Sequence, residues 1–431
     1  LKHREQSWHA NRRGFPSSPY VSNFGILTYN PLMLAHTPSA VGGSVGTIDT
    51  QFLDLPSPVA LDCGEELSPV RVAYETYGTL APARDNVILV CHALSGDAHA
   101  AGYARTLSDR STRDGFRAEE RDADSDHSLG WWDGMIGPGK AFDTDHFFVV
   151  STNLLGGCRG TTGPSSINPQ TGRAYGSDFP VITVADMVRV QRAFLRELGI
   201  TRLATVTGGS LGGMLALEWA VLYGDEVESI VVIASTPALR PQGVAWNAIA
   251  RNAITTDPDW QGGHYYAAGC TPTAGMSIAR MLGHMTYLSA DSLDDKFGRR
   301  LQSSDDIRYV LNEPEFEIES YLRHQAKIFV ERFDANTYLY LSRALSYFDL
   351  ARQHGSGKLV DAVHSLTAKT LLIAFSSDWL YPPEDSKKLT AALAEAEKDV
   401  ELHVIDAPYG HDCFLLEEAL QSPIIRRFLM K

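Results

Sequence analysis

Residues 205–214, with the sequence TVTGGSLGGM, decide the fold. A β-rich run enters this segment, and an apolar helical pattern over residues 215–222 follows it. Ser210 occupies the centre of a G-x-S-x-G pattern, which is typical of a serine on a tight turn between a strand and a helix. Small residues at Gly208 and Gly212 allow the close backbone packing of such a turn. The turn would expose the Ser210 hydroxyl at a helix N-terminus, where negative charge is stabilised.

The same five-residue pattern occurs a second time, around Ser44. No strand-forming run precedes Ser44 and no helical pattern follows it, so the context excludes it. For Ser210 the context predicts a nucleophile, with a serine that serves only the turn as the alternative.

Short β-rich runs alternate with helical patterns after Thr47, which is typical of a largely parallel sheet covered on both faces. The predicted strands are nearly continuous in Val, Ile and Leu, as buried strands are, and they span residues 70–77, 86–94, 147–155, 202–207, 229–234, 370–375 and 400–405. Residues 184–198 have the apolar spacing of a crossover helix, and Thr183 with Asp186 resembles a capping box.

Residues 237–366 lack this alternation and are predicted to form helices, for example over 318–329 and 337–349. Because core strands resume at Thr370, we expect a helical lid inserted between two parts of one core, residues 47–236 and 367–431. An independent second domain is the alternative.

Residues 1–46 are rich in Pro, Ser, Gly and Arg, and Glu5 is their single acidic residue. This composition predicts a disordered N-terminal extension. The extension could be a transit peptide, a dispensable segment or the result of an overlong annotated start.

The composition of the 431 residues excludes several classes of protein. The net charge of -14 provides no global positive field for nucleic acid or an anionic membrane. The longest apolar runs, such as residues 86–94, are much shorter than the roughly 20 residues of a membrane span. The five cysteines are scattered without C-x-x-C spacing, which argues against a disulfide framework or a zinc site and favours a reducing cytoplasm.

A serine nucleophile needs a histidine base, and the histidine needs a carboxylate to fix its tautomer. Asp378 follows the predicted strand 370–375, and His411 follows the last predicted strand. Both would lie at the same sheet edge as Ser210, in the chain order serine, acid, histidine. The sequence therefore predicts an α/β-hydrolase fold with a triad of Ser210, Asp378 and His411.

Other residues compete for these roles. Asp349 lies in the predicted lid and Asp412 adjoins the histidine in sequence, so Asp378 is the preferred acid. The remaining candidate bases are interpreted as ordinary, hydrogen-bonded histidines: His92, His99, His284 and His364.

Acyl chemistry also needs N–H donors for an oxyanion. The residue after the nucleophile, Leu211, is expected to provide one. The second is expected from residues 91–96, which follow an early strand and are called the oxyanion loop below; Leu94 is the chosen residue.

Seven blocks of sequence extend the pattern along the chain. They are CHALSGD (residues 91–97), GWWD (130–133), GPGK (137–140), NLLGGC (153–158), GTTGPSS (160–166), GGSLGG (208–213) and SYFD (346–349). Through them, from about Ile48 to Phe428, the chain resembles homoserine O-acetyltransferases and close relatives that use succinyl-CoA or accept serine. Leu211 stands where relatives often have methionine, and Ser95 where many have threonine; neither departure removes a catalytic group.

The resemblance implies a cytoplasmic homodimer that associates through its lid. It also implies that Arg280, Tyr287 and Asp412 bind the acceptor, since an amino acid offers a carboxylate to Arg280 and an ammonium to Asp412. A solvated lid arginine and a helix-capping aspartate are the alternatives for two of these residues. Acetyl-CoA or succinyl-CoA would be the cosubstrate, without a metal or redox cofactor.

The expected reaction is ping-pong acyl transfer through Ser210 to the hydroxyl of L-homoserine. A hydrolase with the same triad is the main rival, and a nonenzymatic receptor is a third class that would not need the three residues intact. The sequence leaves open acetyl against succinyl donors and homoserine against serine acceptors, because pocket shape decides them.

Overall fold

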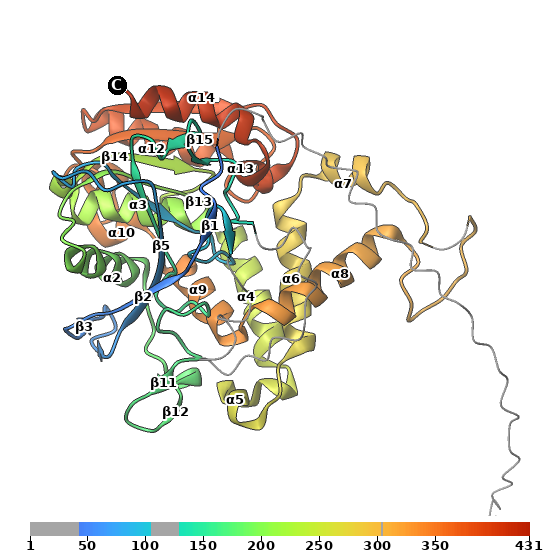
Figure 1. Ribbon diagram of the computed structural model, residues 1–431. Helices are drawn as coiled ribbons and strands as arrows, with labels where there is room; N and C mark the ends of the chain where they lie inside the picture. The colour runs from blue at the N-terminus through green and yellow to red at the C-terminus, as the bar shows by residue number, and fades with distance from the viewer. Residues whose placement is uncertain (1–42, 105–128, 303–304) are drawn as a thin grey trace, which may run out of the picture. The chain divides into compact units, whose positions relative to one another are not determined.

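An eight-stranded sheet forms the centre of the computed structural model, which describes residues 43–104, 129–302 and 305–431 (Figure 1). The strand order is β16-β15-β14-β13-β6-β10-β5-β2. Neighbouring strands from β16 to β10 are parallel, and β5 and β2 add an antiparallel edge. The strands are β2 (Gln51–Asp54), β5 (Arg71–Tyr77), β6 (Val87–Cys91), β10 (Phe148–Thr152), β13 (Leu203–Gly209), β14 (Val227–Ile233), β15 (Lys369–Phe375) and β16 (Val400–Ile405).

The structure confirms the predicted fold class and the seven predicted strands, whose ends shift by three residues or fewer. The prediction missed β2, because this four-residue edge strand is mostly exposed and carries no buried apolar run. Both faces of the sheet are covered, which explains the apolar strands. Successive residues of β14 alternate between two cores: Ile230 and Val232 lie in one, and Val231 and Ile233 lie in the other.

Helices cover these two cores on opposite faces, as Figure 1 shows for α2 and α14. One core includes residues of α2 (Val184–Glu197), α3 (Leu211–Leu222) and α12 (Pro383–Glu395), and the other includes residues of α14 (Glu418–Leu429). The capping box predicted at the start of α2 is present, since Thr183 and Asp186 bond each other's backbone N–H groups.

Helices also fill the chain between β14 and β15, and they are called the inserted helices below. They are α4 (Pro241–Thr255), α5 (Tyr265–Ala268), α6 (Thr273–Tyr287), α7 (Ala290–Lys296), α8 (Glu317–Arg332), α9 (Ala335–Tyr347), α10 (Leu350–His354) and α11 (Leu359–Ala362). Helix α6 packs on both α4 and α8, in the group coloured yellow-green to orange in Figure 1.

The C-terminal end of α6 reaches the loops that follow β15 and β16. Trp379 Nε1 donates a hydrogen bond to Leu288 O at 2.9 Å, and a Cβ atom at Gly410 would come within 2.8 Å of the backbone of Leu288 and Ser289. These contacts bring the inserted helices to the sheet edge where the parallel strands end.

Most of the predicted N-terminal extension lies outside the described residues. Its last four residues do not behave as a free tail: Gly43 N–H donates to Pro138 O at 2.8 Å, and Gly46 O accepts from Tyr103 N–H at 2.9 Å. Among the helices that the structure describes, none has the length and apolarity needed to cross a membrane.

Candidate active site

Ser210 lies on a strained turn between β13 and α3. Its φ of 58° and ψ of -121° are unusual for a residue with a side chain. A Cβ atom at Gly208 or Gly212 would come within 2.4 or 2.1 Å of Cys91 O, so both positions need glycine, as the motif predicts. The Ser210 N–H donates to Ile233 O at 3.0 Å, which fixes the turn to the next strand.

Asp378 and His411 are in direct contact in the loops after β15 and β16. His411 Nδ1 lies 2.8 Å from Asp378 Oδ2, and both residues are buried. Asp378 Oδ1 also accepts from the backbone N–H groups of Leu380 (3.0 Å) and Tyr381 (2.9 Å). These three bonds orient the carboxylate toward His411, and a proton on Nδ1 leaves Nε2 able to act as a base.

Tyr381 joins the three parts of the predicted triad, and the sequence analysis missed it. Its backbone holds Asp378, its ring centroid lies 5.0 Å from that of His411, and its hydroxyl bonds Ser210. Burial raises the pKa of Tyr381, and the bond with Ser210 opposes this rise. The one signal in the sequence that could have indicated this role is the position of Tyr381, three residues after Asp378.

The competing acids have other surroundings. Asp349 caps α10, because its side chain accepts from Arg352 N–H at 3.0 Å. Asp412 is half-buried near His411 and Arg280, and desolvation raises its pKa to about 6 against the attraction of both groups. The acid that contacts His411 Nδ1 is Asp378.

The competing histidines are mostly hydrogen-bonded, as expected. Buried His99 lies 2.9 Å from Glu75, and His92 bonds two backbone groups, while His364 is exposed. His284 is also hydrogen-bonded, because its Nδ1 lies 3.4 Å from the Tyr321 hydroxyl, but its buried Nε2 has no partner in the described ranges, and burial lowers its pKa to about 3.

The two predicted oxyanion donors end up on neighbouring segments. Leu211 begins α3, and the oxyanion loop follows β6, which pairs with β13. Within the described part of the chain, neither the Leu94 N–H nor the Leu211 N–H donates a hydrogen bond, so both are available to a ligand. His92 fastens the loop: it accepts from Leu154 N–H at 3.0 Å and donates to Ala93 O at 2.7 Å.

The three predicted acceptor-binding residues gather beside His411. Tyr287 ends α6 with its ring centroid 6.3 Å from that of His411, and Arg280 Cζ lies 5.7 Å from the Tyr287 ring. Burial raises the pKa of Tyr287, while Arg280 and its hydrogen bond oppose the rise. The buried Arg280 Nε has no partner among the described residues. A positive and a negative group, Arg280 and Asp412, thus stand next to the histidine.

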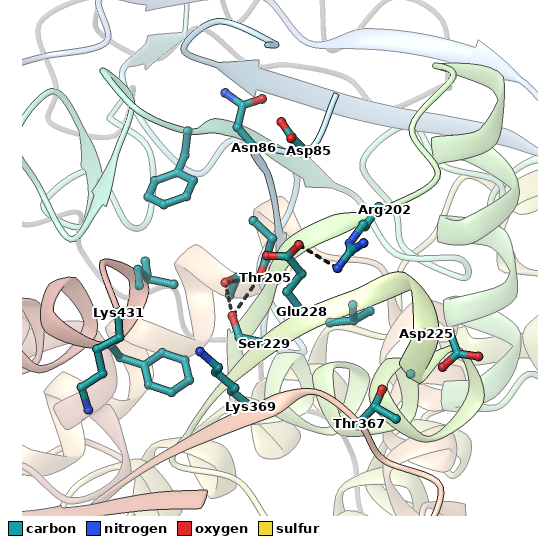
Figure 2. A pocket seen from close by; sticks show the side chains of 16 residues that line it. Asp85, Asn86, Arg202, Thr205, Asp225, Glu228, Ser229, Thr367, Lys369 and Lys431 are labelled. Atoms are coloured by element: carbon teal, nitrogen blue, oxygen red, sulfur yellow. Dashed lines mark hydrogen bonds and ion pairs between the residues drawn. The ribbon is translucent and has the colours of Figure 1, made fainter. Parts of the chain in front are cut away.

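A surface hollow of about 670 Å³ lies elsewhere, at the opposite edge of the sheet (Figure 2). It is lined by residues at the starts of the parallel strands, such as Asn86 and Lys369. Two of its charged residues, Arg202 and Glu228, form an ion pair of 2.9 Å with each other. Active sites in parallel sheets lie at the carboxyl ends of the strands, so this hollow is a different feature.

A serine on a strand-to-helix turn, with a histidine–aspartate pair at the same edge of a mostly parallel sheet, defines an α/β-hydrolase-fold enzyme. The family model described as the alpha/beta hydrolase fold matches residues 86–418. The chain is 47% identical over 387 residues to the homoserine O-acetyltransferase of Methanococcus vannielii, covering 90% of this chain and 74% of that protein. It is 48% identical to the homoserine O-succinyltransferase of Bordetella pertussis, over 92% and 91% of the two chains. The chain belongs to this family of homoserine O-acyltransferases.

Solved structures show the same relationship. The crystal structure of homoserine O-acetyltransferase from Bacillus anthracis matches with a TM-score of 0.78 and 31% identity, covering 89% of this chain and 98% of that one. Esterase E22 matches with a TM-score of 0.75 and 33% identity, over 89% and 100% of the chains. The fold is therefore shared with a protein named as an esterase.

Replacing Ser210 with alanine tests the nucleophile. Ser210→Ala should lower turnover by about 10⁴-fold, because a triad without its nucleophile keeps only substrate binding and oxyanion stabilisation. Ser44→Ala is the matched control, since exposed Ser44 has the same sequence pattern without the turn. Steady-state rates of CoA release measure both variants, and near-normal turnover in Ser210→Ala would contradict a covalent mechanism.

Proposed function

We propose that the protein transfers an acyl group from acyl-CoA to the hydroxyl of L-homoserine through an acyl-enzyme on Ser210. The observation that carries this proposal is the pair of opposite charges, Arg280 and Asp412, beside His411. An amino acid carries the complementary pair, a carboxylate and an ammonium group. Hydrolysis does not require such a pair for its nucleophile, because water carries neither charge.

Acylation begins when His411 Nε2 removes the proton of Ser210 and the serine oxygen attacks the thioester carbonyl. The resulting oxyanion accepts hydrogen bonds from the N–H groups of Leu94 and Leu211 at the positive end of α3. Collapse of this intermediate breaks the carbon–sulfur bond, and His411 returns its proton to the leaving thiolate. CoA leaves and the acyl group remains as an ester on Ser210.

Transfer to the acceptor reverses these steps with a different nucleophile. Arg280 binds the acceptor carboxylate, Asp412 binds its ammonium group, and His411 takes the proton of its hydroxyl. The hydroxyl oxygen attacks the acyl-enzyme, and the restored Ser210 receives the proton from His411. Holding the acceptor in this orientation gives it the kinetic advantage over water that transfer requires.

Acetyl is the donor group we favour, with succinyl as the alternative, and homoserine is favoured over serine as the acceptor. Identities of 47% and 48% to an acetyltransferase and a succinyltransferase do not separate the donors. Hydrolysis by the same triad is the second candidate function, which the similarity to esterase E22 favours.

We propose that the inserted helices, within residues 237–366, form the lid of the site. The acyl-CoA serves as a cosubstrate, without a resident metal or redox cofactor. Cytoplasm is the proposed location, a compartment that suits the five free cysteines.

Removing the charge of Arg280 separates transfer from hydrolysis. Arg280→Ala should raise the acceptor KM about 10- to 100-fold, because the carboxylate loses a charge-assisted bond, while acylation survives. The measurement is the burst of CoA release without acceptor, followed by titration with homoserine. If the wild type releases CoA equally fast without an amino acid and Arg280→Ala behaves identically, the protein is a hydrolase and the transferase proposal is wrong.

The ionisation of Asp412 should appear in the pH dependence of acceptor binding. Because the pKa of Asp412 is raised to about 6, its carboxylate is charged above that pH and protonated below it. The acceptor KM should therefore rise about tenfold per pH unit as the pH falls below 6. Asp412→Asn should have a high KM at every pH from 5 to 8. A wild-type KM that stays flat over this range would show that Asp412 does not bind the ammonium group.

We propose a homodimer that associates through the inserted helices. Several large apolar side chains on α4, α6 and α9 are exposed, which is typical of an interaction surface: Ile249, Ile278, Met285 and Tyr347. Light scattering should give twice the monomer mass for the wild type and the monomer mass for Ile249→Asp combined with Ile278→Asp. Ile167→Asp, at a still more exposed site on β11 (Ile167–Asn168), should remain dimeric. A monomeric wild type would refute the proposal.

A further inference from the structure

Arg332, the last residue of α8, touches the oxyanion loop. Its Nη1 donates to Ser95 O at 3.1 Å, one residue beyond Leu94. Its Cζ lies 5.6 Å from the centre of the Phe329 ring, and Arg280 Cζ lies 4.7 Å from the centre of the same ring. The two guanidinium groups, which come from α8 and α6, therefore share one buried phenyl ring beside the proposed acceptor site.

A third arginine adds to this charge. Arg159 Nη2 donates to the backbone carbonyl of Arg332 at 2.6 Å. Arg280 and Arg159 both repel the charge on Arg332, and with burial as the largest cause they lower its pKa to about 10, against the opposing attraction of Asp97. Arg332 thus stays protonated at neutral pH. Over the described ranges, neither Arg332 nor Arg280 makes an ion pair of 4 Å or less.

A structural role does not account for this charge. One bond to the Ser95 carbonyl could come from a neutral amide, which would not be repelled by Arg280 and Arg159. A guanidinium group in this place is destabilised until an anion binds. The buried, unpartnered Nε of Arg280 is a separate observation that also indicates a missing anionic ligand.

We propose that Arg332 is a second carboxylate-binding residue of the acyl-transfer site, next to Arg280. This inference rests on the proposed function and deepens it. The carboxylate has two possible sources: the α-carboxylate of the acceptor, shared with Arg280, or the distal carboxylate of a succinyl group on Ser210. The position of Arg332 at the oxyanion loop brings its charge near the acyl carbonyl, which supports a role in selecting the donor as well as the acceptor.

Two substitutions test the charge separately from the fold. Arg332→Gln keeps a hydrogen-bond donor for Ser95 and removes the charge, and Arg332→Lys keeps the charge without the planar fork of donors. Each variant is assayed with acetyl-CoA and succinyl-CoA, with homoserine as acceptor, and with p-nitrophenyl acetate as an uncharged ester. Arg299→Gln is the matched control, because exposed Arg299 lies 5.1 Å from the Phe316 ring in a similar cation–π contact.

In Arg332→Gln, p-nitrophenyl acetate should acylate Ser210 at a rate within about twofold of the wild-type rate. The kcat/KM for the substrate whose carboxylate Arg332 binds should fall about 10- to 100-fold. Arg332→Lys should retain part of this activity, and Arg299→Gln should match the wild type. A homoserine KM raised with both donors identifies the acceptor carboxylate. A loss confined to succinyl-CoA identifies the donor carboxylate.

Two results would overturn the inference. An equal loss with p-nitrophenyl acetate would mean that Arg332 only holds the oxyanion loop in place, and unchanged kinetics with every substrate would mean that it has no role. A wild type without acceptor-dependent CoA release from any donor would instead refute the proposed function, and the inference with it. The wild-type assay alone gives that outcome, before any variant is made.

Discussion

The close approach of the Cys91 carbonyl to the turn at Ser210 is the constraint on which the site depends. Gly208 and Cys91 are direct partners in the pairing of β13 with β6, and no room remains for a Cβ at Gly208 or Gly212. This single backbone contact fixes the strained serine, the start of α3 and the first residue of the oxyanion loop together. The nucleophile and both proposed oxyanion donors therefore move as one unit, which is how a site preorganises charge stabilisation.

The parallel sheet then supplies the remaining groups at the same edge. His411 and Asp378 follow neighbouring strands, β16 and β15, and the histidine–aspartate bond joins their loops. On the other side of the serine, His92 ties the oxyanion loop to the backbone of Leu154, after β10. Burial lowers the pKa of His92, so the ring stays neutral and keeps the acceptor nitrogen that this bond requires.

Much of the fold and the site core could be predicted because each rests on local signals. Glycines around Ser210, apolar strands and polar residues just after the strands are visible in sequence, and the rule that parallel strands end at one edge brings them together. The capping box of Thr183 with Asp186 could be predicted for the same reason, because its two residues are three apart in sequence.

The site features that the sequence did not predict depend on contacts between segments that are far apart in the chain. Arg332 meets Ser95 across 237 residues, and nothing in the pattern of α8 distinguishes it from the exposed arginines of other helices. Tyr381 was missed for a related reason, since its role depends on where three loops converge. The unpartnered Nε2 of His284 could not be foreseen either, because hydrogen-bond satisfaction is a property of the packed structure.

The difference between transfer and hydrolysis thus lies outside the serine, histidine and aspartate. A protein named as an esterase shares the fold, so the sheet edge alone does not choose the nucleophile that attacks the acyl-enzyme. The charged groups proposed to bind the acceptor come largely from the inserted helices. Their surroundings are desolvated enough to raise the pKa of Asp412 to about 6. In such surroundings each bond to an amino acid is stronger than it would be in water. The overall charge of -14 would repel an anionic cosubstrate such as acyl-CoA, so local positive groups must provide any attraction. The proposed selection of the acceptor over water therefore depends mainly on the inserted helices, and the sheet provides the chemistry that either nucleophile can use.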